Sequence, residues 1–161
     1  MQMKKSLLVA TIVGLAFVFA AAGLYAGTTV DDVIKMQNKA YESHEKGIVE
    51  FTHKKHAEDY AKANPEFYKD GCGTCHHDDK GQPLTGLKAG DNVQSCIDCH
   101  NKPGEKPKGK DAPKLSKEEE LQYHAEAIHD NCRGCHREYN RKNNTRAAPT
   151  SCSKCHPREK K

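Results

Sequence analysis

All eight cysteines of the chain lie in four copies of one pentapeptide, Cys-x-x-Cys-His, and none is left over. This pentapeptide is the attachment signature of c-type haem. Its two thiols reach the two vinyl groups of one porphyrin, and the histidine is placed beneath the iron as an axial ligand. We therefore predict four covalently bound haem c groups, at Cys72, Cys75 and His76; Cys96, Cys99 and His100; Cys132, Cys135 and His136; and Cys152, Cys155 and His156.

Three other uses of cysteine fit this repeat less well. In structural zinc sites, two Cys-x-x-Cys pairs share one metal and no histidine has to follow each pair. A disulfide framework needs an even cysteine count, but it does not need the trailing histidines. A thioredoxin-like redox motif lies in a βαβ unit, of which the sequence gives no sign. The repeat therefore favours haem.

The chain from residue 27 onward is poor in the side chains that build a core. Leu, Ile, Val and Phe number 14 of its 135 residues, below the level of about 20% at which a folded core becomes doubtful. Burial of so little apolar area does not offset the conformational entropy of the chain. We expect haem to fill the interior, so that the apoprotein is unfolded and the holoprotein folded. An enzyme with a large side-chain core is disfavoured.

Residues 1–26 differ in composition from the rest. They contain Lys4 and Lys5, then an uncharged apolar run from Leu7 to Ala22, then small residues. This order is typical of a secretory signal peptide, so we expect a periplasmic protein, with an extracellular location as the alternative. Retention of the apolar run as a membrane anchor is a further alternative. No second apolar run follows, which argues against a multi-pass membrane protein.

Histidine is abundant enough to supply both axial ligands of every iron. Four haems with two imidazoles each need eight histidines, and the chain has ten. An iron that is closed on both faces transfers electrons, whereas an open iron binds oxygen or substrate. The count favours an electron carrier. The six histidines outside the motifs are His44, His53, His56, His77, His124 and His129.

The order of these histidines is similar to that of a known family. Phe51-x-His53-x-x-His56 precedes the first motif, which ends in a doubled histidine, and His129-Asp130 precedes the third motif. Residues 48–156 thus resemble the tetrahaem cytochromes c3, the class III c-type cytochromes. The resemblance implies loops and short α-helices wrapped around four haems, with little β structure. It also implies four distal ligands: His53 opposite His76, His77 opposite His100, His56 opposite His136, and His129 opposite His156.

The sequence departs from the family pattern in two places. Many members carry Cys-x-x-x-x-Cys-His at the second and fourth sites, whereas all four motifs here are Cys-x-x-Cys-His. The step from His124 to His129 is also longer than the common family spacing, so His124 is the alternative distal ligand of the fourth haem. We expect His44 to be an exposed histidine on an N-terminal helix.

Hydrophobic periodicity and turn residues predict the local structure. Val30, Val33, Ile34 and Tyr41 share a helical face, which predicts a helix over residues 29–46. This helix would form an N-terminal extension, residues 27–47, ahead of a tetrahaem domain at 48–161. Within that domain we expect a strand at 48–51, a helix at 54–63, a turn-rich loop at 81–90, a helix from the capping box Ser116-x-x-Glu119 to about His129, and a polar linker at 137–146.

We expect a non-enzymatic, low-potential electron carrier of anaerobic respiration. The resemblance implies redox partners, namely a periplasmic hydrogenase or dehydrogenase, or membrane and outer-membrane multihaem cytochromes. Six lysines between Lys102 and Lys117 are candidates for docking an acidic partner. The balance beyond residue 26, 24 Lys and Arg against 22 Asp and Glu, does not support nucleic-acid binding. The alternatives are a subunit of an extracellular multihaem filament and a multihaem reductase.

Overall fold

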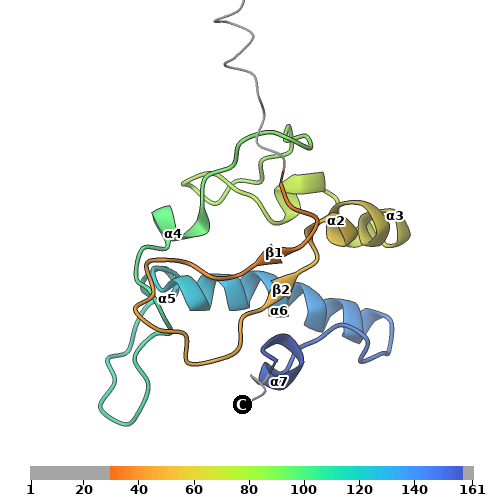
Figure 1. The fold of residues 1–161 in the computed structure, drawn as a ribbon. Helices are drawn as coiled ribbons and strands as arrows, with labels where there is room; N and C mark the ends of the chain where they lie inside the picture. Colours follow the sequence, from red (N-terminus) through yellow and green to blue (C-terminus); the bar gives the residue numbers. More distant parts are fainter. Residues whose placement is uncertain (1–29, 158–161) are drawn as a thin grey trace, which may run out of the picture. The chain divides into compact units, whose positions relative to one another are not determined.

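The computed structural model describes residues 30–157, and Figure 1 draws the remaining residues in grey. The signal peptide expected at residues 1–26 lies outside the described residues. In the described part, short helices are joined by long irregular segments, and one two-stranded sheet forms (Figure 1). This agrees with the expected fold of loops and short helices with little β structure.

The N-terminal segment forms a strand where a helix was expected. Strand β1 (Ile34–Lys35) pairs antiparallel with β2 (Glu50–Phe51), with Ile34 opposite Phe51. Residues 30–46 contain no helix, so the predicted helix at 29–46 is wrong. Two of the four residues expected to share a helical face, Val30 and Val33, remain 42% and 45% exposed. Their β-branched side chains also favour extended backbone over helix.

A continuous helical stretch follows β2 and carries two of the predicted ligands. It consists of α2 (His53–Lys55), one wider turn with π-type hydrogen bonds (His56–Tyr60) and α3 (Ala61–Ala63). The stretch ends at Asn64, before Pro65, as the sequence predicts. Single π-type turns often occur at functional sites, and this one begins at His56. Two 3-10 turns then lead through the first motif, Pro65–Phe67 and Gly71–Thr74.

The loop after the first motif folds back on that motif. The backbone N–H of Leu84 donates to the carbonyl of His76 at 2.9 Å, and His77 forms an isolated bridge with Pro83. Gly73 is buried here, and a Cβ on it would lie 2.9 Å from the backbone of Leu84. The close approach of the two backbones therefore requires glycine at position 73.

The second half of the chain contains α4 (Cys96–Cys99), α5 (Lys117–Leu121), α6 (His124–Lys142) and α7 (Cys152–Cys155). The predicted capping box is present: the N–H of Glu119 donates to Ser116 Oγ, and the Glu119 carboxylate accepts from the N–H of Ser116. The predicted single helix from here to about His129 is wrong, because α5 ends at Leu121.

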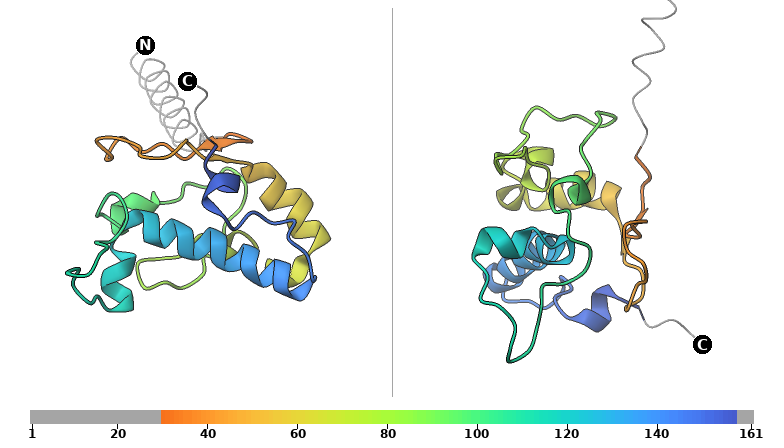
Figure 2. Two further views of the ribbon diagram at one scale, coloured as in Figure 1. Left: turned by 90° about the horizontal axis from the view of Figure 1, so that it is seen from below. Right: turned by 90° about the vertical axis from the view of Figure 1, so that its left-hand side faces the viewer.

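A parallel bridge between Lys102 and Tyr123 explains the break between α5 and α6. The N–H of Lys102 donates to Gln122 O at 2.9 Å, and the N–H of His124 donates to Lys102 O at 2.8 Å. Tyr123 is therefore held in extended backbone geometry. Helix α6 then runs through the third motif to Lys142, so the expected linker at 137–146 is helical over most of its length. With 19 residues, α6 is the longest helix of the described part of the chain, and Figure 2 shows it in light blue.

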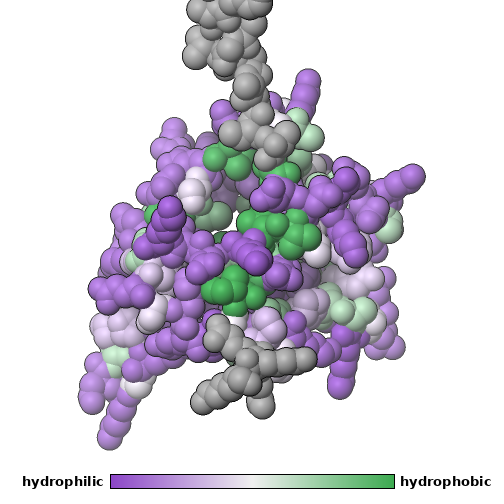
Figure 3. Space-filling view, viewed as in Figure 1, coloured by the Kyte–Doolittle hydropathy of each residue, from purple (hydrophilic) through white to green (hydrophobic). Residues whose placement is uncertain are grey.

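Side chains do not form a core in the described residues, since no apolar or polar side chain there is buried. Polar residues cover most of the face seen in Figure 3, and apolar residues appear in small separate groups. A domain of this length normally buries a continuous apolar cluster. The expectation that side chains alone do not fill the interior therefore holds for this part of the chain. None of its helices has the length and apolar character that crossing a membrane requires.

Candidate functional site

Each motif histidine faces a second histidine from elsewhere in the chain. These are the four pairs that the family resemblance implied. Their ring centroids are 6.4 Å apart for His53 and His76, 5.9 Å for His77 and His100, 6.2 Å for His56 and His136, and 6.2 Å for His129 and His156.

This spacing matches what one iron between two imidazoles requires. A metal–nitrogen bond of about 2.0 Å on each side places the two ring centroids about 6.3 Å apart. The observed separations, 5.9 to 6.4 Å, lie close to this value. Direct stacking of aromatic rings also occurs at such distances, but it gives no reason for the same pairing at four separate motifs. The histidine pairs therefore fit bis-imidazole ligation of haem iron.

Backbone carbonyls orient several of the rings. The Nδ1 atoms of three motif histidines lie 2.5 to 2.9 Å from carbonyl oxygens: His100 from Leu121, His136 from Pro149 and His156 from Gly47. His56 and His77 make the same contact with the carbonyls of Thr52 and Asp78. A carbonyl can only accept a hydrogen bond, so Nδ1 must carry the ring proton in these contacts, and Nε2 of the neutral imidazole is left unprotonated and available to a metal.

Phe51 lies beside the two histidines that follow it. Its ring centroid is 5.9 Å from that of His53 and 4.7 Å from that of His56. The ring of Tyr60 packs edge-on against His56 at 5.1 Å. Burial lowers the pKa of His56, against the effect of its bond to the Thr52 carbonyl. The neutral form that a metal ligand must have is thus favoured in the folded chain.

Thiols of the other three motifs act electrostatically on the thiol of Cys132. The surroundings of Cys132 raise the pKa of its thiol to about 11, chiefly through burial and then through Cys75, Cys155 and Cys96. These three thiols belong to the first, fourth and second motifs respectively. Asn131, next to Cys132, also donates its side-chain N–H to the carbonyl of Cys75 at 3.3 Å. The attachment points of the four predicted haems therefore converge around the N-terminal half of α6.

The two histidines left over have a different environment. Tyr41 Oη lies 2.8 Å from Nδ1 of His124, and the Tyr41 ring stacks on His44 with centroids 5.2 Å apart. Burial, followed by the influence of His100, lowers the pKa of His124. It is His129, and not His124, that faces His156. The predicted exposure of His44 is confirmed, although the helix expected to carry it is absent.

The structure adds one residue that the sequence did not single out. Arg133 lies inside the third motif, yet it acts electrostatically on His129 and Cys155 of the fourth site. Its Nε is buried without a hydrogen-bond partner in the described residues, as is Thr74 Oγ1. A half-buried guanidinium with an unpaired Nε suits the carboxylates that haem carries. An arginine between two motif cysteines gives no sequence signal for this role, since its neighbours come from another motif.

No group of three or more His, Cys, Asp or Glu able to hold a metal ion occurs within residues 30–157. The pattern of paired imidazoles next to Cys-x-x-Cys motifs is that of a multihaem c-type cytochrome. The chain matches the model of the class III cytochrome c family over residues 29–156, and it belongs to that family. Neither the curated proteins nor the solved structures gave a match.

Membership of the family establishes the function at a general level. Class III cytochromes are electron carriers with covalently bound haem c, so multihaem electron transfer and redox-protein partners follow for this chain. The match begins at residue 29, so it includes the segment at 29–47 that precedes the histidine and cysteine motifs. Strand β1 lies in that segment and pairs with β2 of the motif-bearing part.

Proposed function

We propose that this protein carries four bis-histidine haem c groups and serves as a low-potential electron carrier between redox proteins. The four facing histidine pairs, with centroids 5.9 to 6.4 Å apart, are the observation that supports this proposal most directly. Each motif would attach one porphyrin through its two cysteines. The axial pairs would be His53 and His76, His77 and His100, His56 and His136, and His129 and His156.

The chain's own residues give reasons for electron transfer rather than substrate conversion. Imidazoles on both faces leave no open coordination position, and the bound iron supplies reversible one-electron chemistry. Bis-imidazole ligation with partial exposure favours the reduced state less than methionine–histidine ligation in a buried site, so low potentials are expected. Ligands such as His76 and His77 are adjacent in sequence but serve different irons. This adjacency brings neighbouring irons close together, as electron hopping requires.

We further propose that the carrier works outside the cytoplasm, in anaerobic respiration. The apolar run behind Lys4 and Lys5 supports export. Periplasmic hydrogenase or dehydrogenase and multihaem membrane cytochromes are the proposed partners, by analogy with the family. N-terminal sequencing of mature protein purified from its host tests cleavage of the signal, and an intact residue 1 would instead favour retention of the apolar run as a membrane anchor. Recovery of the protein in the cytoplasmic fraction would contradict export.

Contacts within the chain weaken the case that the loop carrying most of the six lysines from Lys102 to Lys117 docks a partner. The ammonium of Lys102 lies 5.2 Å from the ring centre of Tyr123. Carboxylates partly neutralise three others of these six lysines, through the salt bridges Lys106–Glu120, Lys108–Glu105 and Lys117–Asp130. If the loop still steers an acidic partner, electron exchange slows as salt rises, and charge reversal of Lys110 and Lys114 slows it at low salt.

Haem content and iron coordination test the proposal directly. A pyridine haemochrome assay with intact mass should give four haems per chain, and electron paramagnetic resonance of the oxidised protein should show only low-spin ferric iron. Fewer than four haems would overturn the cofactor assignment. A high-spin signal would instead favour a reductase with an open iron. Analytical ultracentrifugation distinguishes a monomeric carrier from a filament subunit.

A further inference from the structure

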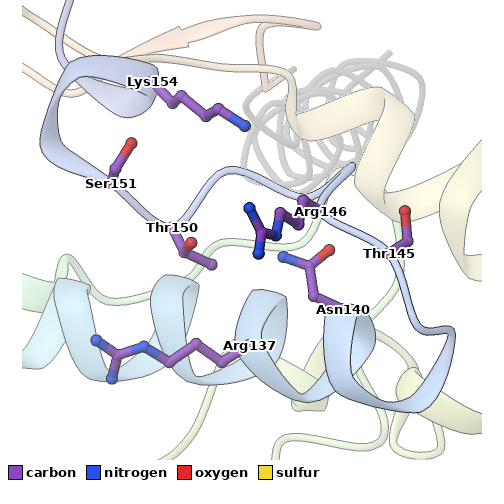
Figure 4. A pocket seen from close by; sticks show the side chains of 7 residues that line it. All are labelled: Arg137, Asn140, Thr145, Arg146, Thr150, Ser151 and Lys154. Atoms are coloured by element: carbon purple, nitrogen blue, oxygen red, sulfur yellow. The ribbon is translucent and has the colours of Figure 1, made fainter.

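A basic pocket lies between the second half of α6 and the segment that leads into α7. It has a volume of about 380 Å³, and its lining includes Arg137, Arg146 and Lys154. The other lining residues are neutral and polar, and Asn140 and Thr150 are among them. Figure 4 shows the guanidinium of Arg146 near the Asn140 amide and the Thr150 hydroxyl, with the Lys154 ammonium pointing toward the same space. The lining contains three cations and no carboxylate.

These three cations have no salt-bridge partner in the portion of the chain that the structure describes. The neighbouring Arg141 shows the contrast, since its guanidinium is paired with the carboxylate of Glu138 at 2.6 Å. Among residues 30–157, no such bridge forms to Arg137, Arg146 or Lys154. Like charges that share a pocket repel one another, and a bound anion relieves this repulsion.

The basic pocket is distinct from the proposed haem sites. A second pocket lies on α7, and its lining includes Cys152 and His156, which the proposed function assigns to the fourth haem. The basic pocket is lined by none of the cysteines and none of the histidines. The basic pocket therefore involves no proposed iron ligand or attachment cysteine, although Lys154 lies between the two cysteines of the fourth motif and Arg137 follows the third motif.

Hydrogen bonds fix one wall of the basic pocket. The Asn140 side chain donates to the carbonyl of Ala148 at 2.9 Å and accepts from its N–H at 3.1 Å. The N–H of Thr145 donates to the Asn140 carbonyl at 2.9 Å. These bonds tie the segment that carries Arg146 to α6 on both sides of that residue. Binding of a ligand therefore requires little ordering of the backbone.

We propose that the basic pocket binds a free inorganic oxyanion of the phosphate class. A guanidinium offers two parallel N–H donors that match two oxygens of such an ion, and an ammonium and a hydroxyl add further donors. Three cations are balanced better by a dianion than by chloride. The positive charge comes from Arg137, Arg146 and Lys154, and Thr150 offers a neutral hydrogen-bond donor. The hydrogen bonds of Asn140 fix the backbone on one side of the pocket.

Binding at this site is coupled to the oxidation state of the haems, a consequence that rests on the proposed function. Arg137 directly follows His136, whose Nδ1 lies 2.7 Å from the Pro149 carbonyl beside Thr150. Oxidation adds one positive charge at each iron, so a nearby anion binds the oxidised protein more tightly. The coupling is reciprocal, and we expect phosphate to bind the oxidised protein at least about threefold more tightly than the reduced protein.

The test is calorimetric titration of the holoprotein with inorganic phosphate, against sodium chloride at equal ionic strength. Arg146→Gln should weaken phosphate binding about tenfold or more, because it removes a charged donor pair. Arg141→Gln is the matched control, since it removes the same charge outside the pocket and should leave the affinity within about twofold. Haem content of each variant, measured separately, shows whether the proposed function itself holds.

Several results would overturn the oxyanion site. These are absence of phosphate binding with four haems present, equal binding of chloride, and equal losses in Arg146→Gln and Arg141→Gln. A haem carboxylate already seated in the pocket would give the first of these results. Equal affinity in the oxidised and reduced states would overturn the coupling, whereas a correct haem count would leave the electron-carrier proposal intact.

Discussion

The distal ligand of the fourth haem gives the sharpest test of the ligand assignment. His124 and His129 both lie on α6, and the sequence left both as candidates. The centroid of His129 lies 6.2 Å from that of His156, close to the spacing for two ligands of one iron. His124 instead bonds to Tyr41 at 2.8 Å. We therefore predict that His129→Ala opens one iron in four, and that His124→Ala opens none.

Carbon monoxide binding to the reduced protein measures this difference. His129→Ala should bind about one carbon monoxide per chain, and its oxidised form should show high-spin iron in about one quarter of the haem, because one coordination position is open. His124→Ala is the matched control, and it should bind none, like the wild type. Its expected cost is the Tyr41 hydrogen bond, about 1 kcal/mol of folding stability. Carbon monoxide binding by His124→Ala, or its absence in His129→Ala, would reverse the assignment.

Three further predictions concern residues near the histidine pairs and their effect on folding stability. Gly47→Ala should lower the free energy of unfolding by about 1–3 kcal/mol, because the new Cβ would overlap the Pro157 carbonyl and shift the Gly47 carbonyl that orients His156. Thermal unfolding measures this loss and should show none for Gly86→Ala, because a Cβ at position 86 meets open space. Ser116→Ala should cost about 1 kcal/mol through loss of the α5 cap, and Ser43→Ala close to nothing, by the same assay. Burial holds the pKa of His124 below its usual value of 6.5, so its contribution to stability is present above that value and is lost as pH falls through the lowered pKa. Chemical denaturation between about pH 7 and pH 5 should therefore show a smaller loss of unfolding free energy in His124→Gln than in the wild type. An equal loss would contradict this role of His124.

The sequence supports the most specific predictions where chemistry fixes the spacing of residues. Attachment of one porphyrin dictates Cys-x-x-Cys-His, so four sites are predicted from the motif alone, and the family match supports covalently bound haem c. The choice of distal histidines needed the family resemblance, because His56 and His136 lie far apart in sequence and no local rule joins them. The capping box at Ser116 was also predictable, since both of its hydrogen bonds form within four residues.

Prediction failed where distant contacts determine the backbone. The apolar positions from Val30 to Tyr41 fit a helical face, but pairing of Ile34 with Phe51 makes the segment extended. Pairing of Lys102 with Tyr123 divides a predicted helix in two. In both cases the competing partner lies more than ten residues away in sequence. Periodicity within a short window does not contain this information.

The four proposed axial histidine pairs explain how a chain with few apolar side chains can adopt one fold. Three of the axial pairs join positions 23, 23 and 27 residues apart, whereas His56 and His136 are 80 residues apart. Because closure entropy grows with the logarithm of loop length, the long closure costs about 1 kcal/mol more than each short one. The three short closures fold separate segments, and only the third haem would have an axial ligand beside β2 and its attachment cysteines on α6. The N-terminal strands should therefore depend on the third haem more than on any other, even though its cysteines lie far from them in sequence.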